Sequence, residues 1–311
     1  MKSSTELSKK TTPIQTHKSK RSNETLTGWL FASPWVIGLL LFFAYPLLSS
    51  IYYSFTDYSI FQAGEFIGLS NYQELFTDEL FWISIGNTIY FALLFVPLSI
   101  IFGVALAMVL NMKIKGMSVY RTIFFLPTLV PHVALAILWI WLLNPEFGLI
   151  NAALGTIGID GPPWLGSTFW SKPSLILMSL WGMGQAVIIY LAGLGDISQE
   201  YYEAADVDGA SFLQKTFKIT LPLLTPVIFF NLVMGFIGAF QQFTLPYTMT
   251  DGSGSPADSL TFYVMYLYDN AFSYFRMGYA SAMAWILFII IMGLTAFVFW
   301  TSKRWVHYQG D

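Results

Sequence analysis

Six long stretches without a charged side chain constrain this chain most strongly. They cover residues 25–56, 80–112, 122–145, 173–195, 219–250 and 277–302. Each exceeds the roughly 20 apolar residues that a helix needs to cross the hydrocarbon core of a bilayer. A helix satisfies its own backbone hydrogen bonds in lipid, and these runs lack the short alternating pattern of barrel strands. We therefore predict an all-α membrane protein with six transmembrane helices, at about residues 29–54, 84–111, 121–143, 173–194, 219–246 and 279–301.

The composition agrees with a lipid environment. Hydrophobic residues make up 55% of the chain and charged residues 11%, whereas soluble domains carry about 25% charged residues. The absence of cysteine excludes disulfides and thiolate ligands, and His17, His132 and His307 are too dispersed to indicate a metal site. We expect no metal and no cofactor bound by this chain.

The basic residues predict the orientation in the membrane. After six spans both ends lie on one side, and one choice of sides places every lysine and arginine except Lys172 and Arg276 on that side. Basic residues concentrate in cytoplasmic segments, so we predict a multi-pass protein of the cell membrane with both termini in the cytoplasm. Residues 1–27 are expected to form a disordered tail, 28–302 the transmembrane domain and 303–311 a second cytoplasmic tail. The outer loops 55–83 and 144–172 form either short surface helices or plain connections.

A polar, helix-prone stretch at residues 203–222 separates two apolar spans on the inner side. It starts with Glu203-Ala204-Ala205, which are good helix formers. Gly209 tolerates the left-handed conformation that ends a helix, and Pro222 suits the first turn of a new one. This pattern predicts a short surface helix, a glycine corner and the start of a membrane helix.

This stretch resembles the EAA loop in the membrane subunits of ABC importers. That loop reads Glu-Ala-Ala, three residues, Gly, nine residues and Ile-x-Leu-Pro; its fixed positions are filled here by Glu203, Ala204, Ala205, Gly209, Ile219, Leu221 and Pro222. The resemblance implies a coupling loop at about 196–218 in which these residues and Asp206 dock on an ATPase. Glu200, Glu203 and Asp206 would form its acidic face, and Tyr201, Ala204 and Val207 an adjacent apolar one. The alternative is an ordinary amphipathic loop.

The resemblance extends over about residues 28–302 to the carbohydrate-uptake branch of these permeases, and the pattern is similar to a MalF/UgpA-like subunit. It implies the type I ABC importer (MetI-like) fold. It further implies a second, MalG-like permease as heterodimer partner, two ATPase subunits that hold ATP and Mg, and an extracytoplasmic solute-binding protein. The bilayer is then the other partner, and no nucleic acid is expected. The segments that carry this wider likeness are 124–127, 139–151, 202–226 and 278–280.

The sequence predicts that the chain is not an enzyme. It contains neither a Gly-x-x-x-x-Gly-Lys-Ser/Thr phosphate loop nor a Ser/His/Asp or Cys/His arrangement. We therefore expect no catalytic residues, and ATP hydrolysis on a separate subunit.

Polar side chains inside the apolar spans are candidates for a substrate path, because such groups usually face the protein interior or water. The candidates are Gln185, Asn231, Gln241, Gln242 and Tyr247. The simpler interpretation is hydrogen bonding between helices. Because the spans lack charged residues, a neutral solute is favoured, and we predict half of the path for a sugar or oligosaccharide delivered by a binding protein. The alternatives are another solute such as glycerol phosphate, or a stand-alone channel or secondary carrier.

Overall fold

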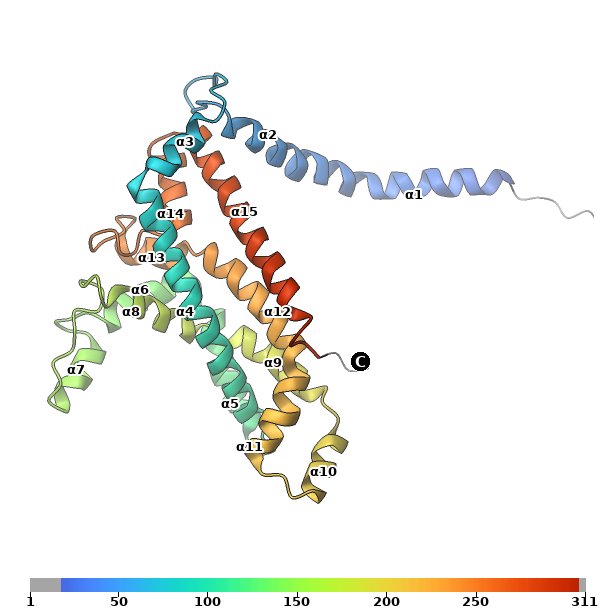
Figure 1. Cartoon of the computed structure of the whole chain (residues 1–311), viewed down its shortest axis with the longest axis vertical. Coiled ribbons are helices and arrows are strands. Elements are labelled where there is room, and N and C mark those ends of the chain that lie inside the picture. The colour runs from blue at the N-terminus through green and yellow to red at the C-terminus, as the bar shows by residue number, and fades with distance from the viewer. Residues whose placement is uncertain (1–17, 308–311) are drawn as a thin grey trace, which may run out of the picture. The chain divides into compact units, whose positions relative to one another are not determined.

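The computed structural model describes residues 18–307, and their regular structure is helical (Figure 1). Residues 1–17 and 308–311, which hold much of the two predicted tails, lie outside the described residues. The chain divides into two compact units, residues 1–52 and 53–311. Each unit is described by itself.

The first unit is helical throughout its described residues. It contains α1 (Lys18–Leu39), a π turn η1 (Leu40–Ala44) and most of α2 (Tyr45–Ser54). Helix α1 includes residues 18–27, the last part of the predicted tail, which contain no Gly or Pro. In η1 the Tyr45 N–H donates to the Leu40 carbonyl directly before Pro46, a wide turn that relieves the clash of a proline ring with the preceding turn.

The second unit contains the other helices. They are α3 (Ser70–Thr77), α4 (Glu79–Leu110), α5 (Met117–Phe125), η2 (Leu126–Leu129), α6 (His132–Leu142), α7 (Leu149–Thr156), α8 (Ser171–Trp181), α9 (Gly184–Gly195), α10 (Gln199–Val207), α11 (Phe212–Lys215), η3 (Thr216–Thr220), α12 (Leu221–Phe240), α13 (Thr244–Thr250), α14 (Tyr263–Tyr268), η4 (Asp269–Ser273) and α15 (Met277–Ser302). Short helices α3 and α7 occupy the two predicted outer loops.

The described helices supply up to six membrane spans. Four helical runs are each long and apolar enough to cross a bilayer: Thr27–Ser54, Glu79–Leu110, Phe212–Thr250 and Met277–Ser302. Two bent pairs, α5–η2 with α6 and α8 with α9, meet the same standard when each pair counts as one span. The predicted class, an all-α protein with six spans, is confirmed.

Three of the predicted spans are interrupted rather than straight. The chain turns by 99° between η2 and α6, where Pro131 lies, and by 49° between α8 and α9, at Gly182 and Met183. The predicted fifth span ends at Phe240 and resumes as α13. Proline removes a backbone donor and glycine weakens a helix, which accounts for the first two breaks.

Pro222 lies in the first turn of α12, as predicted, but α12 continues a helical run that starts before it. The helical run begins ten residues earlier, where Ser211 and Gln214 form a capping box at the start of α11. The run passes Pro222 through the π turn η3, in which the Leu221 N–H donates to the Thr216 carbonyl. As at Pro46, the wide turn lies directly before the proline.

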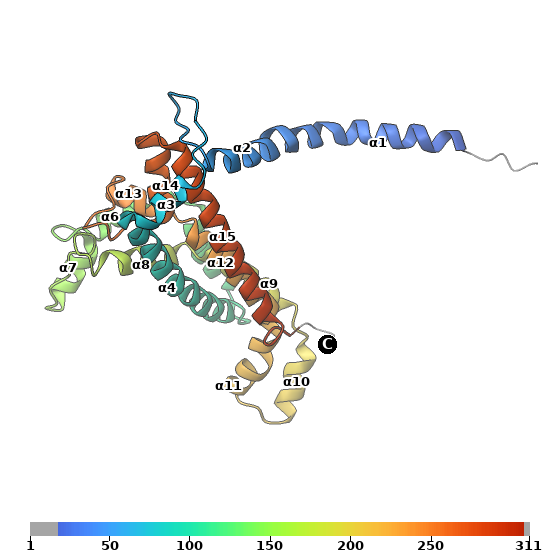
Figure 2. The same ribbon diagram turned by 45° about the horizontal axis from the view of Figure 1, so that its top comes forward.

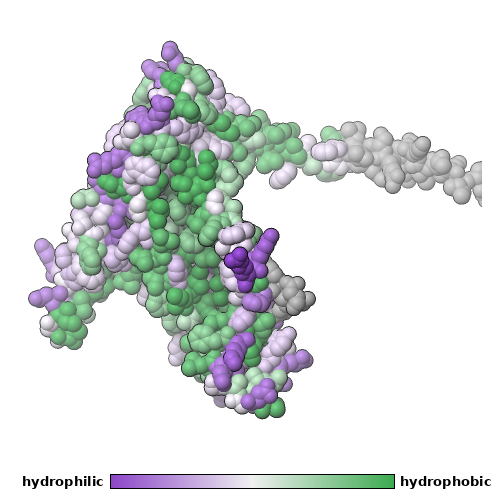
Figure 3. All heavy atoms as spheres, viewed as in Figure 1, coloured by the Kyte–Doolittle hydropathy of each residue, from purple (hydrophilic) through white to green (hydrophobic). Residues whose placement is uncertain are grey.

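Helix α4 is the centre of the second unit. It packs against α8, α9, α12 and α14, and α12 also packs against α15. The crossing of α4 and α9 is close because Gly103 faces the ring of Tyr190, where a Cβ would lie 2.9 Å from Cε2. Small residues permit such approach between membrane helices. Apolar side chains cover the middle of this face of the unit, and polar ones gather toward its ends (Figure 3).

Candidate functional site

Helices α10 and α11 lie at one end of the second unit (Figure 2). The Ser198 side chain caps α10 by accepting the Glu200 N–H. At the other end the Ala210 N–H donates to the Ala205 carbonyl at 2.9 Å, and the Gly209 N–H donates to the Asp206 carbonyl at 3.1 Å. With Gly209 at a φ of +71°, these bonds form a Schellman motif. The predicted short helix and glycine corner are confirmed.

One face of α10 is apolar and stays exposed among residues 18–307. Val207 is 89% exposed and Tyr201 51% exposed, and Ala204 and Glu203 are exposed beside them. Phe212, the first residue of α11, is 72% exposed. An exposed apolar patch with a charged border is typical of a protein–protein contact.

The other residues of the EAA pattern lie on the inner side of α10 or in the helix that follows. Asp206 forms an ion pair with Lys215 of α11. Ala205 is half-buried, as are Ile219, Leu221 and Pro222 at the junction of η3 and α12. The pattern therefore divides into exposed residues on α10 and residues that hold α10 and α12 in place.

A second feature is a cavity of about 380 Å³ between α4, α6, α9 and α12. Two of the predicted path residues, Gln185 and Gln242, line it. The lining also includes Phe91, Phe95, His132, Ser179, Gly235 and Gly238. The cavity thus combines amides, a hydroxyl and an imidazole with two phenyl rings.

The three interruptions of the spans meet at this cavity. His132 begins α6 after the Pro131 break, Met183 lies at the break before α9, and Gln242 lies between α12 and α13; all three line the cavity. A helix break leaves backbone polar groups without intrahelical partners, which membranes tolerate where the backbone borders protein or a water-filled space. Broken helices commonly form the solute sites of transporters.

The remaining path candidates lie elsewhere. Asn231 donates within α12 to the Val227 carbonyl at 3.0 Å. Gln241 is an exposed residue at the end of α12. The ring of Tyr247 packs against those of Phe243 and Tyr268.

Sequence reasoning missed Gly235 and Gly238 as path residues. Their three-residue spacing, which places them on one helix face, was an available signal. His132 is, like the candidates, a polar group inside an apolar span, and it directly follows a proline.

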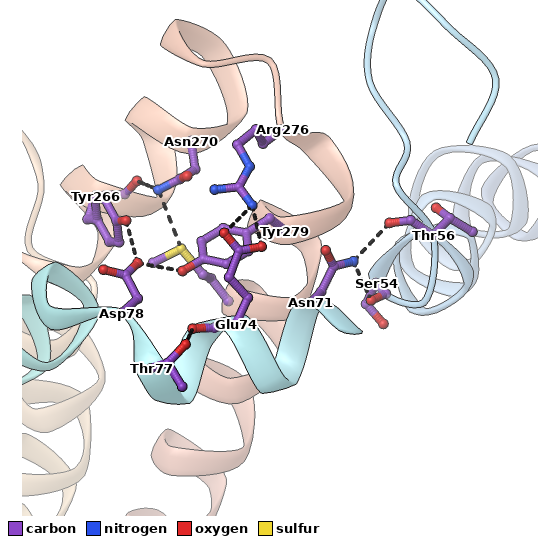
Figure 4. Close-up of polar contacts among 11 residues, drawn as sticks. Ser54, Thr56, Asn71, Glu74, Thr77, Asp78, Tyr266, Asn270, Arg276 and Tyr279 are labelled. Carbon is purple, nitrogen blue, oxygen red and sulfur yellow. Dashed lines mark hydrogen bonds and ion pairs between the residues drawn. The ribbon is translucent and has the colours of Figure 1, made fainter. Parts of the chain in front are cut away.

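At the other end of the second unit a polar cluster joins α3, α4, α14 and α15 (Figure 4). The hydroxyls of Tyr266 and Tyr279 both donate to Oδ2 of Asp78 at 2.5 Å, while Oδ1 accepts from the first amides of α4. Burial by itself would raise the pKa of Asp78, but these hydrogen bonds outweigh it and hold the pKa below its usual value. This cluster fixes the helix ends farthest from α10.

Comparison with known proteins identifies the family of this chain. A family described as binding-protein-dependent transport system inner membrane component matches residues 99–306. The probable ABC transporter permease protein YesP of Bacillus subtilis strain 168 is 45% identical over 94% of this chain and 96% of its own length. The lactose transport system permease protein LacF of Rhizobium radiobacter is 32% identical over 90% of this chain and 95% of its own.

A solved structure has the same fold. It is a bacterial alginate ABC transporter in complex with an alginate pentasaccharide-bound periplasmic protein, and one of its chains matches with a TM-score of 0.81 at 25% identity. The match covers 92% of this chain and 96% of that chain. The fold is thus the MetI-like fold of ABC importer permeases, as the resemblance predicted. This chain therefore belongs to the family of binding-protein-dependent transport system inner membrane components.

Proposed function

We propose that this chain is the membrane-spanning permease subunit of an ATP-driven importer and forms half of the translocation path for a sugar or oligosaccharide. The observation that carries this proposal is the pairing, in one chain, of an exposed docking helix with a polar cavity at broken membrane spans. The docking helix is moved by a separate protein that binds it, and the cavity binds the solute on its way across the membrane.

The energy comes from separate ATPase subunits, two in the assembled importer, which hold the ATP and Mg. Tyr201, Ala204 and Val207 enter a groove of the ATPase, and Glu203 lies at the border of this contact. The ATPase is cytoplasmic, so α10 and both chain termini lie on the cytoplasmic side. The excess of lysine and arginine at this end supports that orientation.

The solute is a saccharide that the cavity binds through hydrogen bonds and ring contacts. Gln185, Gln242 and His132 offer donors and acceptors for hydroxyl groups. Phe95 is half-buried and offers an apolar surface to a sugar ring, and its ring stacks at 5.0 Å on the buried Phe91. The described lining contains no lysine or arginine, so a phosphate ester would lack a cationic partner. LacF and the alginate transporter, named for saccharides, support this substrate class.

The importer also needs two further proteins. A second permease of the same fold supplies the other half of the path, and a binding protein on the far side delivers the saccharide. The alginate transporter was solved with a periplasmic protein that carries its saccharide, which supports such a partner here.

The test uses matched surface variants of the tagged chain, purified in mild detergent from its own membranes. Val207→Asp changes a side chain that is 89% exposed on α10, and Ile60→Asp changes one that is 51% exposed in the loop before α3. We expect the ATPase to co-purify with the parent and with Ile60→Asp, but not with Val207→Asp. Retention of the ATPase by Val207→Asp would contradict the docking surface.

Measurements of uptake distinguish an ATP-driven saccharide importer from a stand-alone channel or secondary carrier. The parent complex is reconstituted in proteoliposomes with the ATPase facing the vesicle interior. Its binding protein and labelled lactose or alginate pentasaccharide are added outside, and uptake is measured with and without ATP enclosed in the vesicles. ATP-dependent uptake of either saccharide supports the proposal. Uptake by vesicles that lack the ATPase would instead indicate a channel or secondary carrier.

A further inference from the structure

Two contacts fasten the inner face of α10 to the end of α11 and to the end of η3, directly before α12. The hydroxyls of Tyr202 and Thr220 share a hydrogen bond of 2.9 Å, and the carboxylate of Asp206 pairs with the ammonium of Lys215. Tyr202 and Asp206 are four residues apart and so lie on the same face of α10. Their partners lie at the two ends of η3: Thr220 is the last residue of η3, and Lys215 directly precedes the first. The two contacts therefore hold both ends of the π turn.

The π turn is an irregular point near the start of this helical run. Its closing bond spans five residues, from the Leu221 N–H to the Thr216 carbonyl, and Pro222 beyond it has no N–H to donate. Wide turns of this kind are rare, are often found at functional sites, and are common causes of helix kinks. An external clamp across η3 can set the angle between α11 and α12.

We propose that Tyr202 and Asp206 are positioning residues that grip the π turn, so that a displacement of α10 moves the base of α12 with it. This inference rests on the proposed function, in which the ATPase moves α10. Helix α12 carries Gly235 and Gly238 of the cavity toward its other end. The grip therefore links the docking helix to the solute cavity through one continuous helix.

The two contacts differ in strength. Tyr202 is half-buried, its ring packs against the buried cluster that includes Leu194 and Leu224, and Thr220 is 7% exposed. The Asp206 side chain is 65% exposed, and water and salt weaken an ion pair at such a site. Tyr202 is the principal contact, and Asp206 limits rotation of α10 about it.

The test measures the grip directly in the assembled importer. This chain contains no cysteine, so spin labels can be placed at Glu200→Cys on α10 and Phe230→Cys on α12 without removing any other cysteine from it. In the parent we expect a narrow distance distribution that keeps its width when ATP is added. In Tyr202→Phe/Asp206→Asn the distance distribution should broaden. Tyr120→Phe is the control and should match the parent. Tyr120 is an exposed tyrosine of α5 whose hydroxyl forms no hydrogen bond within the described residues.

Transport and rescue complete the test. Tyr202→Phe should bind the ATPase and hydrolyse ATP yet import about fivefold less lactose or alginate pentasaccharide per ATP, the effect of one lost hydrogen bond. Asp206→Lys alone should lower this ratio, and Asp206→Lys/Lys215→Asp should restore it, because the charges again attract. A narrow distribution and a normal ratio in Tyr202→Phe/Asp206→Asn would overturn the grip, whereas failure of the parent to bind an ATPase would overturn the proposed function instead.

Discussion

Glu74 and Arg276 form an ion pair that joins α3 to the residue before α15. The Arg276 Nη2 donates to both carboxylate oxygens of Glu74, at 2.6 and 2.5 Å. The same guanidinium lies 4.3 Å from the centre of the Tyr279 ring, whose hydroxyl reaches Asp78. The pair is therefore one part of a larger connection between helices that are distant in sequence (Figure 4).

Arg276→Ala should lower stability modestly. The two side chains are 42% and 50% exposed, and exposed pairs contribute about 1 kcal/mol or less. We expect a fall in the melting temperature of about 2–4 °C, measured in detergent, that shrinks at 1 M salt because salt screens the pair. Arg304→Ala, which removes a ring contact at the other end of α15, serves as the control. A difference that is unchanged by salt would show that the lost charge pair is not its cause.

Asp78→Asn should remove a pH-dependent part of the stability. The pKa of Asp78 is lower in the folded protein than its usual value, so the stabilisation is complete above the usual value of about 3.9 and is lost as pH falls below it. The melting temperature of the parent should drop in this acidic range, while that of Asp78→Asn, already lower because an amide accepts two hydroxyls less well, should change less. Glu79→Gln, the next residue, is the control. Parallel curves for parent and Asp78→Asn would refute this role.

Gly209 should tolerate asparagine but not valine. Its φ is +71°, yet a Cβ there would have no neighbouring heavy atom within 4 Å, so the penalty comes from the backbone conformation and not from space. Asparagine adopts this conformation more readily than β-branched residues, for which it costs about 1–2 kcal/mol. Gly209→Val should reduce ATPase co-purification and uptake more than Gly209→Asn. Equal losses for both variants would indicate that another residue sets the corner.

Gly238→Leu should block transport without weakening the fold. A Cβ at Gly238 meets no heavy atom within 4 Å, and the residue lines the cavity, so the added side chain extends into the space proposed for the saccharide. Gly293→Leu in α15 is the matched control, because it also has open space but lies outside the cavity lining. We expect loss of uptake for Gly238→Leu only, with ATPase co-purification normal in both variants. Normal uptake by Gly238→Leu would exclude the cavity from the path.

Individual residues explain how far the sequence could predict this fold and site. The second span, expected at 84–111, is the helix α4, because lipid requires long apolar helices whatever the neighbours are. The corner at Gly209 was likewise predictable, since a positive φ favours glycine. The break at Gln241 and the bond between Tyr202 and Thr220 were not, because they depend on which helices pack together and not on local preference.

The π turns have a consequence for reading helix faces. One inserted residue advances the phase of a helix by about 100°. Periodicity counted from Phe212 therefore assigns the wrong side to every residue beyond Thr220. Deleting one residue within 216–220 would restore ordinary helical bonding and still leave Gly235 and Gly238 facing the cavity, because the π turn already absorbs the extra residue. The same shift of phase applies beyond Ala44, where η1 ends.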